Sequence, residues 1–521
     1  MKTEKTVSGK QKNYTKKPMR SFFIDLFMIA ILAAAQIVLI CFYVWNLYNS
    51  VFYIEIACRV ISVIVVIYII NKRESSSYKL AWAVPILMFP AFGGILYIIC
   101  QGRLGIFRFK RRIEDVDNDI KTASSRCPDV SGAFAKLRPE HAPNTEYLRR
   151  NGFPLFDHTD AVYFPNGESM YASLLEQLAK AEEYIFIEFF IVHEGVMWNS
   201  ILDLLAEKAA AGVDVRMLYD GMGSITTLPR KYNKYLESRG IKCKIFNKFV
   251  PVVSTMQNNR DHRKIVAIDG RVAYTGGVNL SDEYINEVER FGHWKDAAIM
   301  VKGHAAVEYT LMFLRNWNIF EKKPVSPEYF VRDFDAPACE GYFQPYCDSP
   351  FDDKQIARNV YLSMISRANR YIYIMTPYLI LDEELEAAIK LAAESGVDVR
   401  IITPHHADKI YVHLLTRNSY AGLIRSGVKI YEYEPGFLHS KNILTDDNCA
   451  VVGSVNFDYR SLYLHFECAQ LFYDHPAIQE LKKDFEQTFD ISIEITENDC
   501  RKDKGLPRLF TQLLKLFAPL F

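Results

Sequence analysis

Residues 259–270 read Asn-Arg-Asp-His-Arg-Lys-Ile-Val-Ala-Ile-Asp-Gly, a polar stretch followed by a short apolar run. The pattern His-x-Lys-x(4)-Asp is formed here by His262, Lys264 and Asp269, and the apolar run predicts a β-strand. Because successive strand residues point to opposite faces, a histidine and a lysine two positions apart share one face. A neutral imidazole beside a fixed ammonium suits attack on a phosphate, since the lysine offsets the charge that repels a nucleophile.

The same spacing returns 177 residues later, at His439, Lys441 and Asp446. Each copy is followed by a loop of small residues that ends in asparagine, namely residues 276–279 and 453–456. Such a loop lets the backbone approach a phosphate and adds an amide donor. The predicted phosphate-binding residues are Gly277, Asn279, Ser454 and Asn456. Ser454 can donate a hydroxyl hydrogen bond that Gly277 lacks.

The sequence around the two motifs also repeats. Apolar residues at helical spacing in 171–178 precede a strand pattern at 184–190, and a second such helix ends at Gly212 before another strand. Residues 368–374 match 181–187, and 396–400 match 212–216. This indicates one domain duplicated, with a mostly parallel sheet in each copy and helices outside.

We therefore predict an α/β fold of two similar lobes related by a pseudo-twofold axis, preceded by an N-terminal module of apolar helices. The predicted boundaries are 1–112 for the membrane module, 113–150 for a polar connector, 151–322 for the first lobe, 323–350 for a proline-rich linker and 351–521 for the second lobe. The last residues, 506–521, form an apolar helix that either contacts lipid or packs on the protein.

Apolar segments occupy about 22–45, 51–71 and 80–100, and the first two are long enough to cross a bilayer. Glu55 and Arg59, one helical turn apart in the second segment, are expected to pair. The third contains two prolines and two glycines, so we expect a broken helix. Basic residues crowd the N-terminus, the loop with Lys72, Arg73 and Lys79, and residues 103–112. The positive-inside rule places all three basic flanks in the cytoplasm, which three full spans cannot satisfy. Either the third segment is re-entrant or interfacial, which we favour, or one basic flank lies outside.

Composition excludes several classes of protein. Lys+Arg and Asp+Glu both number 62, so no overall basic field favours nucleic acid. The ten cysteines are scattered without a Cys-x-x-Cys pair, which argues against a disulfide framework and a cysteine zinc site. The two motifs have no obvious metal ligands, so we expect neither metal nor cofactor.

The duplicated motif, with residues 259–264, 436–441 and 453–461, resembles the signature of the phospholipase D superfamily, and within it the bacterial cardiolipin synthases. The resemblance covers roughly residue 81 to the C-terminus. It implies that His262 is the nucleophile and His439 the acid and base, although the internal symmetry leaves this assignment open. It also implies that Asp296 and Glu467 orient the histidines. Asp269 and Asp446 complete the catalytic motif, but their position on the odd side of the strand favours a structural role.

The resemblance implies a reaction in which two phosphatidylglycerols give cardiolipin and glycerol through a phosphohistidine, without a cofactor. We expect phosphatidylglycerol and membrane lipid as partners, no nucleic acid, and a multi-pass protein of the cell membrane with cytoplasmic lobes. The sequence leaves homo-oligomerisation open. Glu188 and residues 376–378 are candidates for contacting the headgroup. The alternatives are a phospholipase D, a membrane-anchored endonuclease, and a non-catalytic lipid-binding protein.

Overall fold

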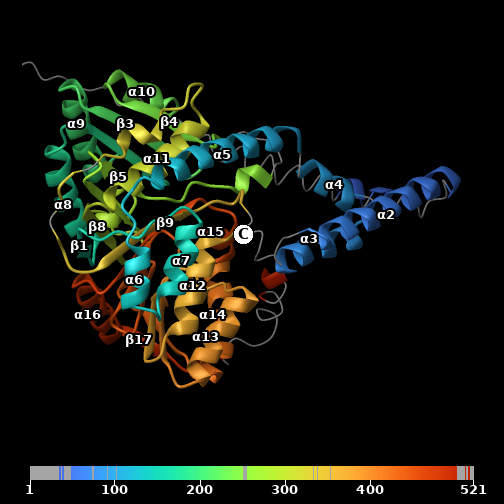
Figure 1. Cartoon of the computed structure of the whole chain (residues 1–521). Coiled ribbons are helices and arrows are strands. Elements are labelled where there is room, and N and C mark those ends of the chain that lie inside the picture. Colours follow the sequence, from blue (N-terminus) through green and yellow to red (C-terminus); the bar gives the residue numbers. More distant parts are fainter. Residues whose placement is uncertain are drawn as a thin grey trace, which may run out of the picture.

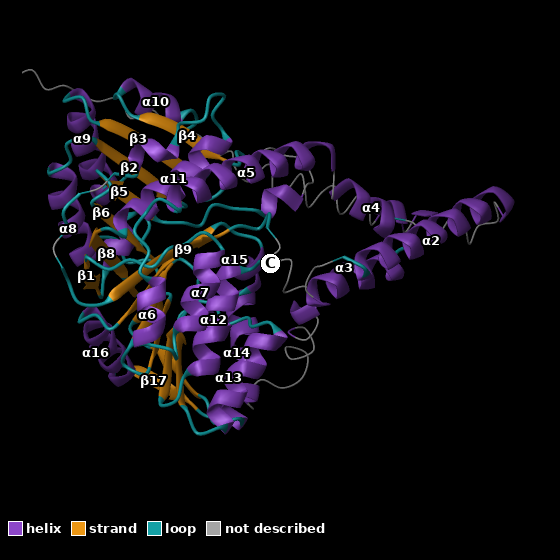
Figure 2. Ribbon diagram, in the orientation of Figure 1, coloured by secondary structure: helices purple, strands orange, loops and turns teal. Residues whose placement is uncertain are grey.

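Two α/β lobes form the body of the protein, and a helical arm projects from it (Figure 1). The computed structural model describes residues 34–36, 38–39, 48–72, 76–90, 92–100, 103–249, 255–332, 334–336, 338–352, 354–500, 511 and 514–516. Within the body the strands lie inside and the helices cover them (Figure 2). This agrees with the predicted mixed α/β fold.

The first lobe contains a seven-stranded sheet in the order β1-β8-β6-β5-β2-β3-β4. Its strands are β1 (Thr159–Phe164), β2 (Tyr184–Phe189), β3 (Asp214–Asp220), β4 (Lys242–Phe246), β5 (Ile265–Ile268), β6 (Val272–Gly276) and β8 (Ala298–Gly303). Its helices are α8 (Gly167–Ala179), α9 (Val196–Ala210), α10 (Tyr232–Ser238) and α11 (Ala306–Ile319), with 3-10 turns η1 (Thr255–Asn258) and η2 (Asp282–Ile285).

The second lobe repeats this order with one additional strand, as β17-β12-β11-β10-β14-β15-β16-β9. Its strands are β9 (Tyr342–Asp348), β10 (Tyr371–Met375), β11 (Asp398–Pro404), β12 (Lys429–Tyr433), β14 (Asn442–Thr445), β15 (Cys449–Gly453), β16 (Glu467–Tyr473) and β17 (Ser492–Ile495). Its helices are α12 (Ile356–Arg367), α13 (Glu383–Glu394), α14 (Ile410–Arg425), α15 (Tyr459–Tyr463), α16 (Ala477–Asp490) and α17 (Glu497–Cys500). The matching strand order confirms the duplication.

The expectation of mostly parallel sheets is wrong. In the first lobe only β2–β3 and β3–β4 are parallel pairs, whereas the four pairs on the other side of β2 are antiparallel. The short turn between β5 and β6 explains the difference, because parallel neighbours need a long crossover and a tight turn allows only an antiparallel pair. Asp269 and Gly270 form that turn with φ of 53° and 67°.

The two lobes share strand pairing as well as a hydrophobic core. Short strands β7 (His293–Lys295) and β13 (Gly436–Leu438) pair in parallel, one from each lobe. Asp261 forms a further parallel bridge with Phe466. One cluster of buried apolar residues includes side chains from both lobes, and every residue of α11 is buried. The lobes are therefore one packed unit.

The predicted connector and linker differ from the structure in part. The connector is helical, with α5 (Arg103–Ser124), α6 (Ser131–Leu137) and α7 (Ala142–Arg150). The buried pair Asp117–Arg315 joins α5 to α11. The predicted linker 323–350 holds the turn η3 (Pro327–Phe330) and also β9, the edge strand of the second sheet. The sequence of α5 does place apolar residues at helical spacing, and the prediction overlooked them; they are buried in the structure (Ile113, Val116, Ile120 and Ala123). By contrast, α6, α7 and β9 are short.

The arm consists of α2 (Tyr48–Ile70), α3 (Ser76–Met88) and α4 (Gly93–Cys100). Among the described residues, one helical stretch, Phe52–Ile70, is long and apolar enough to cross a membrane. The segment at 22–45 lies largely outside the described residues. The expected break in the third segment is confirmed between α3 and α4, and Glu55 pairs with Arg59 as predicted.

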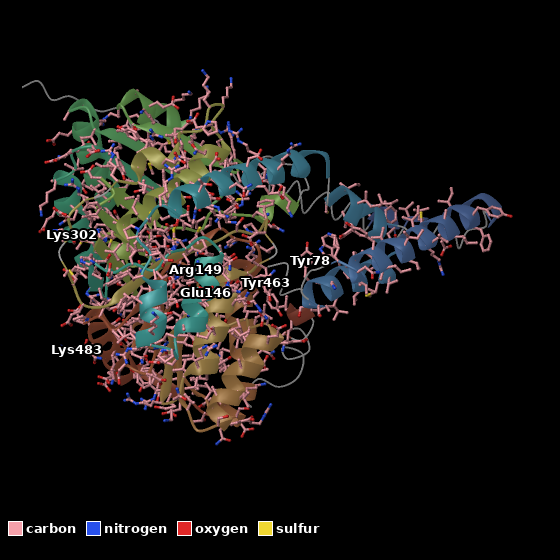
Figure 3. The ribbon with its side chains drawn as sticks, in the orientation of Figure 1. Tyr78, Glu146, Arg149, Lys302, Tyr463 and Lys483 are labelled. Carbon is pink, nitrogen blue, oxygen red and sulfur yellow. The ribbon has the colours of Figure 1, made fainter. Side chains whose placement is uncertain are left out.

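Segments α3 and α4 form a hairpin that packs on the second half of α2. Lys79 Nζ donates to the Ile70 carbonyl, so the start of α3 lies beside the end of α2. Ser62 Oγ donates to the Pro90 carbonyl over 2.8 Å, so the hairpin tip reaches the middle of α2. The arm meets the body at α15, where Tyr459 Oη donates to Ser77 Oγ over 3.1 Å. Figure 3 labels Tyr78 and Tyr463 on the facing sides of the arm and the body.

The C-terminal segment is described at few positions. Leu514 packs against Leu415 and Tyr459 on the second lobe, which favours the packed alternative at that position. The rest of the predicted helix at 506–521 lies outside the described residues, apart from residues 511, 515 and 516.

Candidate active site

Each motif histidine is held by a carboxylate from the other lobe. The Nδ1 of His262 lies 2.9 Å from Oε1 of Glu467, the first residue of β16. The Nδ1 of His439 lies 2.6 Å from Oδ2 of Asp296, which follows β7 in the first lobe. A ring that donates Nδ1–H to a carboxylate keeps its lone pair on Nε2. The two predicted orienting residues are therefore in contact with the two histidines.

Backbone hydrogen bonds between the lobes fix both rings in place. The amide of His262 donates to the Phe466 carbonyl over 2.9 Å, and the amide of His439 donates to the Lys295 carbonyl over 2.6 Å. In each case the acceptor is the residue just before the carboxylate. The backbone that holds one histidine thus also carries its partner acid.

The motif lysines lie next to the histidines and are buried. Lys264 Nζ donates to the His262 carbonyl over 2.5 Å, and Lys441 Nζ donates to the His439 carbonyl. Burial lowers the pKa of Lys264 to about 8 and that of Lys441 to about 7. Lys441 Nζ also lies 2.8 Å from Nδ1 of His439, which agrees with the prediction that this lysine and its histidine share a face.

Both histidines are held in the neutral form. Burial lowers the pKa of His262 well below its ordinary value, and the charges of Lys264 and Lys441 lower it further. Burial also lowers the pKa of His439 to about 4, with Lys441 acting in the same direction and Asp296 opposing. Neutral imidazoles are available as nucleophiles and as bases.

Ser454 and Gly277 lie against the carboxylates, which differs from the predicted contact with phosphate. Ser454 Oγ donates to Oε2 of Glu467. A Cβ atom on Gly277 would lie 2.0 Å from Oδ1 of Asp296, so this position must be glycine for the acid to pack there. Serine thus supports the glutamate in one half, while glycine makes room for the aspartate in the other.

The two loop asparagines differ in their contacts. Asn279 accepts a hydrogen bond from the Ile191 amide over 3.2 Å and donates to Tyr284 Oη over 2.7 Å. Asn456 donates to Asp458 over 3.3 Å, and its Oδ1 is buried without a hydrogen-bond partner among the described residues. The side-chain amide of Asn456 is the freer of the two for a ligand.

Comparison with known proteins places this arrangement in a family. Residues 174–315 and 361–489 match the model of the cardiolipin synthase, PLD-like domain, and residues 60–101 match the phospholipase D-nuclease N-terminal model. The chain belongs to the cardiolipin synthase family of phospholipase D-like proteins. The two matched blocks coincide with the two lobes, and the N-terminal match covers part of α2 and all of α3 and α4.

Relatives of this family match nearly the whole chain. An uncharacterized protein of Streptococcus mutans is 43% identical over 459 residues, which covers 87% of this chain and 99% of the relative. A cardiolipin synthase of Geobacillus thermodenitrificans is 31% identical, covering 90% and 94%. Cardiolipin synthase 2 of Staphylococcus epidermidis is also 31% identical, covering 87% and 94%. The crystal structure of phosphatidylserine synthase from Haemophilus influenzae shares the fold, with a TM-score of 0.53, 15% identity, and coverage of 72% of this chain and 98% of that one.

The aspartates of the family motif are turn anchors in this chain. Asp269 accepts hydrogen bonds from the amides of Glu182, Glu183 and Tyr184 over 2.7–2.8 Å. Asp446 accepts the equivalent three from residues 369–371 over 2.7–3.0 Å. These contacts lie at the end of the strand opposite the histidine. In each motif the histidine and the lysine belong to the site, whereas the aspartate fixes the end of the strand. The inclusion of both aspartates among the catalytic residues is corrected accordingly.

The predicted headgroup contacts are not supported by the geometry. Glu188 is fully buried, pairs with Arg263 and accepts a hydrogen bond from Asn316 over 2.9 Å. Tyr378 donates to Asp408 over 2.6 Å, and burial raises its pKa well above the ordinary value. Position at a strand end was a weak guide because the side chain of Glu188 points into the core.

Sequence reasoning missed His465. Its ring centroid lies 5.5 Å from that of His262, and its Nδ1 lies 3.6 Å from Oε1 of Glu467. Burial lowers its pKa to about 3, and neither ring nitrogen has a hydrogen-bond partner within 3.5 Å among the described residues. In the first lobe the same position, two residues before the carboxylate, is Trp294, 5.4 Å from the His439 ring. The shared offset from Glu467 and Asp296 was the signal that could have revealed it.

Proposed function

We propose that this chain is a phosphatidyltransferase that converts two phosphatidylglycerol molecules into cardiolipin and glycerol. The observation that carries the proposal is the crossed pair of carboxylate–histidine contacts, His262–Glu467 and His439–Asp296, in one buried cluster. Two imidazoles held in this way can divide a displacement at phosphorus into two steps, one as the neutral nucleophile and the other as the acid once it carries a proton. The relatives named cardiolipin synthase support the lipid substrate.

In the first step, Nε2 of His262 attacks the phosphorus of one phosphatidylglycerol. The bond from phosphorus to the glycerol oxygen breaks, and the leaving oxygen takes the Nε2 proton of His439, which must be in its protonated form when this step begins. In the second step, a glycerol hydroxyl of another phosphatidylglycerol gives its proton to His439 and attacks the same phosphorus. The phosphorus–nitrogen bond breaks, which yields cardiolipin and restores His262. Atoms and charge balance without a cofactor.

The contacts of the two histidines support this division of roles. Asp296 acts against the lowering of the His439 pKa, which suits a group that must carry a proton in one step. A bound anionic phosphate would act in the same direction as Asp296 and raise the pKa of His439, because opposite charge favours the protonated ring. Lys264, Lys441 and Asn456 would bind the non-bridging oxygens, and loss of one such donor costs on the order of 3 kcal/mol of barrier.

The arm supports a membrane topology in which α2 spans the bilayer and the α3–α4 hairpin enters and leaves on one side. The hairpin reaches only the middle of α2, at Ser62 and Pro90. Lys72 and Lys79, basic residues of the positive-inside pattern, lie at the end of α2 nearest the body. We therefore propose cytoplasmic lobes and, with the apolar segment at 22–45 as a second span, a multi-pass protein. Labelling of single cysteines introduced at positions 72 and 102 in sealed vesicles should give the same side for both, and opposite sides would exclude the hairpin.

The reaction is tested with the full-length protein in vesicles of phosphatidylglycerol, with lipid products measured by mass spectrometry. Cardiolipin and glycerol should appear in equal amounts, and His262→Ala and His439→Ala should each abolish them. Phosphatidic acid as the main product would instead identify a hydrolase. Lipid binding without turnover by the wild type would identify a non-catalytic protein.

A further inference from the structure

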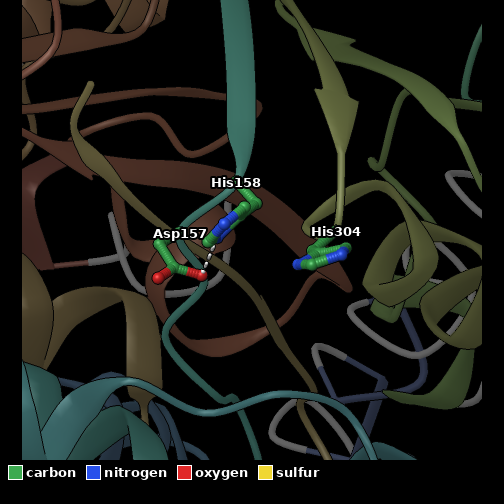
Figure 4. A group of neighbouring side chains, drawn as sticks. All are labelled: Asp157, His158 and His304. Atoms are coloured by element: carbon green, nitrogen blue, oxygen red, sulfur yellow. Dashed lines mark ion pairs between the residues drawn. The ribbon is translucent and has the colours of Figure 1, made fainter. Parts of the chain in front are cut away.

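A group of side chains of the types that bind metal ions lies at the edge of the first sheet, outside the catalytic cluster. Asp157 and His158 precede β1, and His304 follows β8. One potential ligand atom from each of the three residues lies within 4.8 Å of the other two. Figure 4 shows the three side chains around a common space, with Asp157 and His158 in contact.

The backbone brings these residues together. Strands β1 and β8 are antiparallel, and Thr159 opposes Gly303, so the residues just outside the pair are neighbours. The amide of His304 donates to the His158 carbonyl over 3.2 Å. A Cβ atom on Gly303 would lie 2.2 Å from that carbonyl, and its φ of 129° suits glycine. Glycine at this position therefore allows the close approach of the two histidines.

The ring of His304 has the hydrogen bonding expected of a metal ligand. Its Nε2 lies 3.3 Å from the carbonyl of Phe334, so Nε2 carries the proton and donates it. The other nitrogen, Nδ1, then holds a lone pair. This atom is buried and has no hydrogen-bond partner among the described residues. Metal-bound histidines typically donate the second ring nitrogen to a carbonyl or a carboxylate in this way.

The other two residues supply charge and access. The Nδ1 of His158 lies 2.8 Å from Oδ1 of Asp157, and their side chains are 43% and 33% exposed. An ion can therefore reach the group from solvent. Among the described residues Asp157 forms an ion pair with His158 alone, so no lysine or arginine already neutralises it.

We propose that Asp157, His158 and His304 bind a divalent transition-metal ion, for which zinc is the best match. Two imidazoles and one carboxylate are ligands that zinc accepts in a tetrahedral site, with water in the fourth position. Magnesium and calcium prefer oxygen ligands only. The scattered cysteines play no part in this site.

The site is separate from the proposed catalytic centre. Asp296 lies just before β8 and His304 just after it, so at about 3.3 Å per residue they are about 25 Å apart. A bound ion would join the ends of β1 and β8, and through the Phe334 carbonyl it would also hold the segment that leads from the first lobe to the second. Its expected effect is stabilisation of the folded chain.

The test is zinc binding to the full-length protein in detergent, measured by competition with a chromophoric chelator. The catalytic cluster contains a second candidate group, His262, His465 and Glu467, so all measurements use a His262→Ala background. In that background we expect one zinc per chain. His158→Ala and His304→Ala should lose it, and Asp157→Asn should weaken it by about tenfold or more. The matched control is His406→Ala, which removes an exposed histidine elsewhere and should leave binding unchanged.

A melting curve in chelator shows whether each variant is folded. Zinc should raise the melting temperature of the His262→Ala parent and of His406→Ala, raise that of Asp157→Asn less, and leave those of His158→Ala and His304→Ala unchanged. If His304→Ala does not fold, two other measurements decide the question: zinc binding by Asp157→Asn, and the absorption spectrum of cobalt bound to the His262→Ala parent. Tetrahedral and octahedral cobalt differ in colour, and we expect the tetrahedral spectrum. The proposal is overturned if the His262→Ala parent binds no zinc at micromolar concentration. It is also overturned if the folded variants bind zinc as tightly as the parent.

Discussion

Glu467 contacts the proposed nucleophile His262, the nearby His465 and Ser454, so several contacts of the site converge on this carboxylate. Its negative charge stabilises the positive charge that forms on His262 when the ring attacks phosphorus. The acid also fixes the tautomer of that ring. In the other half the corresponding acid is Asp296, and the residue that lies against it is Gly277 in place of a serine.

We predict that Glu467→Gln lowers kcat by on the order of 10²–10⁴-fold, because the amide keeps the size of the side chain but removes its charge. The Ser454→Gly variant should have a smaller effect, since it removes one hydrogen bond. Initial rates of cardiolipin formation measure both. Glu494→Gln, an exposed acid on β17, is the control. Unchanged turnover in a folded Glu467→Gln protein would contradict the role of the acid.

The two lysines predict a pH dependence. Burial lowers the pKa of Lys441 to about 7 and that of Lys264 to about 8, so each is cationic below its pKa and neutral above it. Because the cationic forms attract phosphate, loss of these charges should make kcat/KM for the free enzyme fall as pH rises from about 7 to about 9. Bound phosphate favours the charged forms, so kcat should fall at higher pH than kcat/KM. A kcat/KM that rises throughout this range would contradict the assignment.

At the scale of single elements, the turn that joins β5 to β6 is fixed by Asp269. Its carboxylate holds three amides at the start of β2, which ties the β5 end to its neighbour in the sheet. The equivalent contacts of Asp446 hold the start of β10. Both aspartates have positive φ, a conformation that aspartate adopts more readily than most residues.

We predict that Asp269→Asn destabilises the protein by about 1–3 kcal/mol, because the amide turns an NH₂ group toward a backbone donor. The kcat per folded molecule should stay within a few-fold of wild type. Thermal unfolding measures the change in stability, and initial rates divided by the concentration of folded protein measure the change in kcat. A large loss of kcat with unchanged stability would return this residue to the catalytic group.

Most central elements could be predicted from sequence, whereas some of the flanking ones could not. The strands that follow each motif are short apolar runs in a repeated context, so β5 and β14 were both expected. The connector helix α5 carries many charges, but its buried apolar residues stand at helical spacing, so this helix was overlooked and not unpredictable. The strand β9 contains a proline and gains its identity from pairing with β16. Such a strand is decided by tertiary contacts that a local pattern does not contain.

At the scale of the whole molecule, the two lobes depend on each other. The motif spacing predicted that His262 and Lys264 share a face, and the resemblance supplied Glu467 and Asp296. The exchange of acids between lobes, the supporting role of Ser454 and the presence of His465 became visible only in the folded chain. The exchanged acids lie 143 and 205 positions from their histidines, and no local pattern indicates a contact across such distances.

We predict that a chain cut between the lobes loses activity unless both pieces are present. Residues 1–322 and 323–521 expressed separately should each be inactive and poorly soluble, because the shared core is exposed in each. Co-expression should restore cardiolipin formation in part. Activity of either piece alone, measured in phosphatidylglycerol vesicles, would show that the crossed contacts are dispensable.

The crossed acids also bear on how such a chain could arise. If each lobe descends from one ancestral copy, that ancestor lacked an acid for its own histidine within the same chain. It could be active only when two copies met about a twofold axis, each supplying the acid for the other. Fusion of the two genes would then have made a permanent pair out of a reversible one, after which the two positions beside the rings were free to diverge into Trp294 and His465.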